Sequence, residues 1–303
     1  MSYQTQKRVI TTLFLIIPIA LLLIFTYLPT GLVAAISTLE WSGTDEPVFV
    51  GFLNYQTILT NVDVFEPLFN SVYYFIGAIV QMIIALLLAT ILSFKVKFKN
   101  FFKGVLFFPY LINGIAVGLI FTFFFRENGV LNEVLNWFGQ NSTTDWLREN
   151  IINNVLLASV SVWKYMGFNL VMFIGAIQSI SAEVYEAADM DGANKFQVFR
   201  YIIFPSIRNI ILLNLILSVK GAVSVYELPL IMTGGEWNTA TFVIKTIQLG
   251  INGRYLQIGL ASAMSFVLFA IIVSVTLLQM FAFKDKKEVT TIELKKNRLE
   301  VLT

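Results

Sequence analysis

The sequence predicts an all-α, polytopic membrane protein with about six transmembrane helices. Of its 303 residues, 57% are hydrophobic and 13% are charged, whereas an ordinary soluble domain carries about 25% charged residues. Six apolar runs are long enough to cross a bilayer core of about 30 Å at about 1.5 Å per helical residue. Because water is absent from that core, each run must satisfy its own backbone hydrogen bonds, and a helix does so.

The six runs define the expected spans, within one domain that covers residues 1–303. They occupy residues 9–37, 68–94, 104–125, 152–180, 207–232 and 258–283. Lys7 and Arg8 precede the first run, as basic residues precede the apolar core of a secretory signal. This run is longer than a signal core, and Pro18 and Pro29 interrupt it. We therefore expect it to be retained as a membrane span.

The basic residues between the runs predict the orientation of the chain. They gather on one side of the expected membrane, at Lys7, Arg8, Lys95, Lys97, Lys99, Lys103, Lys195, Arg200, Arg208 and in 284–298, whereas most acidic loop residues lie on the other side. Cytoplasmic loops carry such an excess of Lys and Arg. We expect a multi-pass membrane protein with both termini in the cytoplasm. Because the basic residues cluster on one side of the membrane, they indicate orientation and not nucleic-acid binding.

The composition also excludes several kinds of chemistry. The chain has no Cys and no His, which removes thiol nucleophiles, thiolate metal sites and the commonest general base. No G-x-x-x-x-G-K-[ST] sequence is present to cradle nucleotide phosphates. We therefore expect no catalytic, cofactor or metal site in this chain, and no enzyme activity of its own.

A polar segment at 183–205 carries the most specific pattern, between the fourth and fifth runs. It consists of Glu186, Ala187 and Ala188, then Asp191, Gly192 and Ala193, then Phe199, Ile202 and Pro205. This pattern resembles the EAA loop of ABC importer permeases. The resemblance implies a cytoplasmic coupling helix seated in a cleft of an ATPase subunit, where Glu186 pairs with a basic residue. We expect short helices at 186–190 and 196–201 with a bend at Gly192, since glycine adopts left-handed angles without a side-chain clash. The alternative is an ordinary cytoplasmic helical hairpin.

Three further segments are similar to the sugar-uptake branch of the same family. They are Gly51-Phe52-Leu53-Asn54-Tyr55, Phe108-Pro109-Tyr110 with Gly129-Val130-Leu131-Asn132, and Thr233-Gly234-Gly235 with Ala240-Thr241. Glu236 departs from the pattern, which commonly has Pro at that place. Without the resemblance, Gly234 and Gly235 indicate only a helix end and a turn.

Charged residues inside the spans are candidates for function, because each costs about 2.5–3.5 kcal/mol to insert. Lys164 lies between aromatic residues, and Lys220 and Glu227 are seven apart, which would place them on one helical face. Aromatic rings beside hydrogen-bonding groups suit a sugar. We therefore predict a sugar site from Lys164, Tyr165, Asn169, Tyr226 and Glu227. The alternative is a structural ion pair, or interhelical hydrogen bonds to a partner subunit.

Together these features and the resemblance imply a permease subunit of an ATP-driven importer for a carbohydrate, in particular an oligosaccharide. The resemblance also implies a bacterial-type cytoplasmic (inner) membrane as its location. The implied partners are a second homologous permease, two copies of an ATPase that binds ATP and Mg²⁺, an extracytoplasmic solute-binding protein and membrane lipid. One alternative is the same architecture importing glycerophosphate or another polar solute. The other is an ion-coupled secondary carrier, whose expected internal repeat of interrupted spans is not evident.

Overall fold

The computed structural model describes residues 2–94, 96–252 and 256–282. The chain divides into two compact units, each built from separate stretches of sequence. Unit 1 contains residues 1–74, 113–158 and 223–269, and unit 2 contains residues 75–112, 159–222 and 270–303. The two units are described separately.

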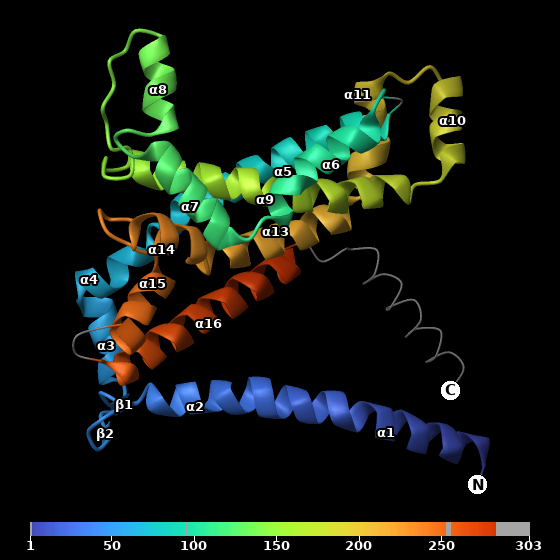
Figure 1. The fold of residues 1–303 in the computed structure, drawn as a ribbon. Helices are drawn as coiled ribbons and strands as arrows, with labels where there is room; N and C mark the ends of the chain where they lie inside the picture. The colour runs from blue at the N-terminus through green and yellow to red at the C-terminus, as the bar shows by residue number, and fades with distance from the viewer. Residues whose placement is uncertain (1, 95, 253–255, 283–303) are drawn as a thin grey trace. The chain divides into compact units, whose positions relative to one another are not determined.

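The described residues are predominantly helical, in the order shown in Figure 1. The α-helices are α1 (Tyr3–Leu22), α2 (Leu28–Ile36), α3 (Leu53–Thr60), α4 (Val62–Phe65), α5 (Ser71–Ser93), α6 (Lys99–Leu111), α7 (Gly114–Phe125), α8 (Val130–Trp137), α9 (Ile152–Gln178), α10 (Ala182–Met190), α11 (Lys195–Gln197), α12 (Phe204–Ser206), α13 (Arg208–Val223), α14 (Glu227–Thr233), α15 (Phe242–Ile247) and α16 (Ile258–Ala282). Three π-helices and a 3₁₀ turn join some of these: η1 (Leu23–Tyr27), η2 (Glu66–Leu68, the 3₁₀ turn), η3 (Val198–Ile203) and η4 (Gln248–Asn252). A short antiparallel pair, β1 (Leu39–Glu40) and β2 (Val48–Phe49), completes the set.

Six helical stretches among the described residues are long and apolar enough to cross a membrane, which confirms the predicted fold class. They are Tyr3–Ile36, Val62–Ser93, Gly114–Trp137, Ile152–Gln178, Arg208–Thr233 and Ile258–Phe281. No residue of Tyr3–Ile36 is buried in the chain. Its apolar side chains therefore need lipid or another subunit around them, because soluble proteins rarely expose so large an apolar surface to water.

Two of the predicted spans are interrupted. In the third, 104–125, helix α6 ends at Leu111, and the extended backbone of Ile112 and Asn113 leads into α7. The Asn113 side chain accepts a hydrogen bond from the N–H of Ile115 at 2.8 Å, which caps the new helix.

The fifth span is interrupted between α13 and α14, where Tyr226 has φ −151° and ψ −33°. Lys220 lies in α13 and Glu227 begins α14. The expectation that these two residues share one helical face is therefore wrong, because the helix does not continue from one to the other.

Unit 1 has a core of buried apolar side chains around Ile58, Phe242 and Met264. Helices α7 and α14 of the same unit lie side by side (Figure 1). The α3 side chains tie the end of the first span to this core. The amide of Asn54 donates to the carbonyl oxygens of Ser37 and Leu39 at 2.9 and 2.8 Å.

Unit 2 has a core made by α5 and α9, to which the 183–205 segment adds buried side chains. Leu170, Phe173 and Ile177 of α9 pack with residues of α5 and with Ala188, Val198 and Ile203. The polar segment is therefore built onto the helix ends of unit 2, and its backbone positions are set by the same core as the spans.

Candidate coupling loop and translocation site

The E-A-A string lies in α10, which starts earlier than expected. The structure begins this helix at Ala182, where the sequence predicted residue 186. Ser181 has extended backbone angles, and Glu183 places a carboxylate in the first turn, where the helix dipole favours negative charge. Glu186 and Ala187 are exposed, whereas Ala188 is buried in the unit 2 core. One face of α10 is thus anchored, and Glu186 is available to another molecule.

The bend after α10 lies at Gly192, as predicted, with a left-handed φ of +74°. The N–H groups of Asp191 and Ala193 donate to the carbonyls of Ala187 and Ala188 at 3.0 and 2.9 Å, which closes the end of α10. A reciprocal capping box between Asn194 and Gln197 then begins α11.

The second helical part of the loop is longer than expected and is not a regular α-helix. The predicted helix at 196–201 is instead α11, followed by the π-helix η3 and by α12. Pro205 lies in the first turn of α12 and has no N–H to donate to the preceding turn, so one helical hydrogen bond is missing there. Buried Val198 and Ile203 hold η3 on the unit 2 core.

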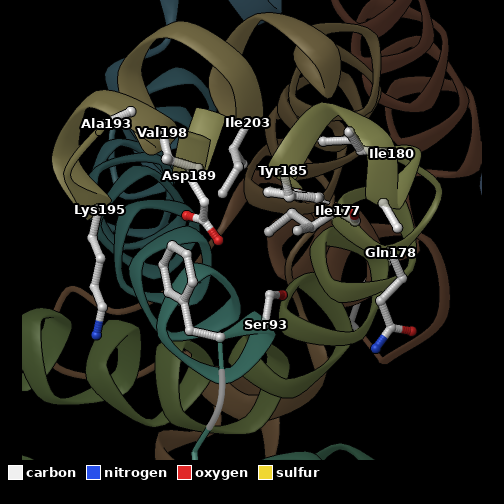
Figure 2. A pocket seen from close by; sticks show the side chains of 12 residues that line it. Ser93, Ile177, Gln178, Ile180, Tyr185, Asp189, Ala193, Lys195, Val198 and Ile203 are labelled. Atoms are coloured by element: carbon white, nitrogen blue, oxygen red, sulfur yellow. Dashed lines mark hydrogen bonds between the residues drawn. The ribbon is translucent and has the colours of Figure 1, made fainter. Parts of the chain in front are cut away.

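A cavity of about 660 Å³ lies between α10, η3 and the ends of α5 and α9. Figure 2 shows the Asp189 carboxylate directed into it and the Lys195 side chain along its edge. The hydroxyl of Tyr185 donates to the carbonyl of Ile177 at 3.4 Å. Burial raises the pKa of Tyr185 above its usual value of about 10, so this hydroxyl stays protonated at neutral pH.

Lys164, the first of the predicted sugar-site residues, is 5% exposed and already has a partner within unit 2. Its Nζ donates to the carbonyl oxygen of Ile112 at 2.6 Å and lies 5.5 Å from the centre of the Tyr165 ring. Ile112 directly follows the last residue of α6, where the helix leaves carbonyls without intrahelical partners and favours a positive charge. Lys164 therefore stabilises the end of α6.

Tyr165 and Asn169 follow Lys164 on α9. The Tyr165 ring packs edge-on against Tyr110 of α6, with centroids 6.3 Å apart. Asn169 is 3% exposed, and its Nδ2 has no hydrogen-bond partner among the described residues. A buried amide without a partner costs about 1–3 kcal/mol, so this donor is suited to a ligand, a water molecule or another subunit.

Tyr226 and Glu227 belong to unit 1, at the start of α14. Tyr226 is exposed. The carboxyl of Glu227 occupies the space that a side chain at Gly114 would need, so it lies at the N-terminal end of α7. Positive partial charge at a helix N-terminus favours a carboxylate there. The structure thus brings together Lys164, Tyr165 and Asn169 within one unit, and Tyr226 and Glu227 within the other.

Several buried asparagines that hold loops in place were missed by the sequence analysis. Asn70 donates to the carbonyls of Asn238 and Ala240 at 3.0 and 2.8 Å. Asn153 donates to Trp237 O at 2.7 Å, and Asn154 donates to Asn238 O at 3.0 Å. Asn153 and Asn154, adjacent amides at the start of an apolar run, were the signal in the sequence. If such amides are buried, they need hydrogen-bond partners.

Comparisons with known proteins agree with this architecture. The family described as "Binding-protein-dependent transport system inner membrane component" matches residues 81–284. The "Probable ABC transporter permease protein YurN" of Bacillus subtilis is 32% identical over 289 residues, covering 93% of this chain and 99% of its own length. The arabinooligosaccharides transport system permease protein AraP of Halalkalibacterium halodurans is 31% identical, covering 79% and 78%. The multiple sugar-binding transport system permease protein MsmF of Streptococcus mutans is 29% identical, covering 88% and 92%.

A solved structure has the same fold. It is a chain of a bacterial alginate ABC transporter in complex with an alginate pentasaccharide-bound periplasmic protein. The TM-score is 0.81 over 93% of this chain and 96% of that one, at 19% sequence identity. At this identity the likeness concerns the arrangement of the helices.

Proposed function

The chain belongs to the family of binding-protein-dependent transport system inner membrane components, and from this premise we propose that it is a permease subunit of an ATP-driven importer for an oligosaccharide. The observation that carries the proposal is the EAA-like loop, folded as a helix with one exposed and one anchored face inside the family match. Relatives named for arabino-oligosaccharides and multiple sugars support the substrate class.

The coupling element in this proposal is the loop around α10. Glu186 and Ala187 meet the ATPase, while Ala188, Asp191, Gly192, Ala193 and Pro205 fix the loop to the spans. Because Ala188, Val198 and Ile203 pack directly on α5 and α9, a push on α10 acts on the spans of unit 2. ATP and Mg²⁺ bind in the separate ATPase chains, of which two copies are proposed.

The sugar path in this proposal uses the predicted set Lys164, Tyr165, Asn169, Tyr226 and Glu227, in which Lys164 acts by holding the end of α6 rather than by contacting the sugar. Asn169 offers an amide donor, and Tyr226 offers an exposed aromatic ring. Within unit 2, Lys164 lies at the end of α6, and within unit 1, Glu227 lies at the start of α7. A second homologous permease completes the path, and an extracytoplasmic solute-binding protein delivers the sugar. Both termini lie in the cytoplasm.

The test is uptake and partner capture in the same cells. Deleting the gene should abolish ATP-dependent uptake of at least one member of a panel of labelled neutral di- to pentasaccharides, and restoring it should recover that uptake. The tagged chain should also bring down an ATPase subunit from mild detergent. Uptake by the chain alone without ATP would contradict the proposal and favour a secondary carrier.

A further inference from the structure

A second, smaller hollow lies next to the coupling loop, on the other side of Phe94 and Lys195. It is a groove of about 290 Å³ within unit 2. Its walls are the last turns of α5, at Leu87, Thr90 and Ile91, together with Phe94 and Val96, and the start of the second helical part of the loop, at Lys195, Phe196 and Phe199. The groove therefore joins a membrane span to the coupling element.

The groove is apolar except at one end. Leu87 and Ile91 are exposed apolar side chains one turn apart on a predicted span, so they are open to an apolar partner outside this chain. The Thr90 hydroxyl already donates to the carbonyl of Leu86 at 2.8 Å, which leaves its methyl group for the groove. Of the described residues that line it, none is acidic, and Lys195 carries the charge. The Lys195 ammonium lies 5.6 Å from the centre of the Phe94 ring.

The chain after Phe94 has the composition of a membrane–water interface. Lys97, Lys99 and Lys103 alternate with phenylalanines, of which Phe98 and Phe101 are 77% and 67% exposed. Aromatic rings and lysines gather where lipid headgroups lie. Basic pockets beside cytoplasmic helix ends attract anionic headgroups. Lys195 is therefore placed at headgroup depth, with an apolar groove leading from it along α5.

We propose that this groove binds one anionic phospholipid, with an acyl chain against Leu87, Ile91 and Phe196 and the phosphate group held by Lys195. The lipid would then touch α5 and the coupling loop together. Such a lipid adds a contact to α11 and η3, which the buried Val198 and Ile203 already hold on the unit 2 core. The inference does not depend on the transported solute.

The test measures lipid binding to the full-length chain in detergent by native mass spectrometry. Phosphatidylglycerol and phosphatidylcholine with the same acyl chains are titrated separately, and the affinity of the first bound lipid is compared. We expect phosphatidylglycerol to bind more tightly. Lys195→Gln should reduce this selectivity about fivefold, the effect of losing one lysine near an anionic lipid surface. Lys7→Gln, a matched loss of charge on the exposed α1, should leave it unchanged.

Two further arms separate the groove from a surface effect. Ile91→Trp fills the groove and should weaken the binding of both lipids. Soluble glycerol phosphate at the same concentration should not displace phosphatidylglycerol, because it has no acyl chain. Equal affinity of the wild type for the two lipids, or an equal loss in Lys195→Gln and Lys7→Gln, would overturn the site. If Ile91→Trp binds lipid as the wild type does, or if glycerol phosphate competes, the acyl chain does not bind in the groove.

Discussion

Single asparagines explain the shorter sequence motifs at the level of residues. In the Gly51–Tyr55 motif, Asn54 binds two carbonyls at the end of the first span. In the motif that begins at Gly129, the buried Asn132 donates to Glu127 O at 2.6 Å and Thr144 O at 2.8 Å and accepts from the Trp146 indole at 2.8 Å. An amide with both donors and acceptors can close a loop in this way, and a smaller or apolar side chain cannot. These motifs thus have a structural role that is independent of solute.

The loop at 233–241 gives a test of this role. Asn70→Ala removes two hydrogen bonds to the backbone of that loop and should destabilise it by about 1–3 kcal/mol, because the carbonyls it served lose their partner. Hydrogen exchange of 233–241 in the purified protein should become faster. Asn100→Ala, at an exposed position of α6, is the control and should not change exchange there. Unchanged protection in Asn70→Ala would show that the loop is held by other contacts.

Two polar residues of α9 should respond differently to substitution. Asn169→Ala removes an amide whose Nδ2 has no partner among the described residues. Uptake should fall about two- to tenfold, the value of one hydrogen bond to a solute, with normal amounts of assembled transporter. Lys164→Ala removes the lysine donor from the partly buried Ile112 carbonyl and should lower the amount of assembled transporter itself. Uptake per assembled complex and complex yield are the two measurements. The reverse pattern would make Lys164 the solute contact and Asn169 a structural residue.

At the level of elements, the sequence predicted where helices pass through the membrane better than where they break. Hydropathy depends on composition, so it identified six apolar stretches but could not detect the break at Ile112, which depends on the Asn113 cap and the Lys164 hydrogen bond from another helix. The bend at Gly192 was predictable because glycine marks a left-handed turn locally. The predicted start of α10 lies four residues late, because the E-A-A string begins in the middle of the helix, whereas Ser181 directly precedes its first residue.

The exposed face of α10 should govern the connection to the ATPase. Glu186→Lys reverses the charge of an exposed side chain without touching the unit 2 core, so the chain should insert normally. The ATPase should be lost during purification, because the lysine repels the basic residue expected in its cleft. Glu133→Lys, the same change on exposed α8, should retain the ATPase. Full retention with normal uptake in Glu186→Lys would remove α10 from the coupling path.

A substitution at the bend after α10 gives a second test of the coupling loop. Gly192 has φ +74°, and no atom lies near the position of an added Cβ. Gly192→Val therefore introduces backbone strain at this angle without a steric clash. Left-handed angles cost an ordinary residue about 1–2 kcal/mol, and the bend should open. Solute-stimulated ATP hydrolysis should fall by more than the amount of folded subunit does. Gly175→Val, at an equally open helical position of α9, should keep its stimulation. Equal stimulation in both variants would show that the bend does not transmit motion.

At the level of the whole molecule, the chain is incomplete as a folding unit in water. None of the residues of Tyr3–Ile36 is buried, although the stretch is strongly apolar. The polar anchors instead hold the segments between the spans: Asn54 of α3, Asn132 of α8 and Asn153 of α9 each donate to a backbone carbonyl that follows a span. This distribution suits a protein whose spans are covered by lipid and neighbouring subunits, and whose loops must hold their own shape on each side of the membrane.

The orientation of those loops can be measured directly, because the chain has no cysteine of its own. Single cysteines replace exposed residues at Thr44 and Gln140, in loops expected outside, and at Gln4 and Met190, expected in the cytoplasm. An impermeant thiol reagent should label the first two in intact cells, since the excess of Lys and Arg lies on the opposite side. The other two should react only after the membrane is permeabilised, which also proves that they are accessible. Labelling of Met190→Cys in intact cells would place the α10 loop outside, where no cytoplasmic ATPase could reach Glu186.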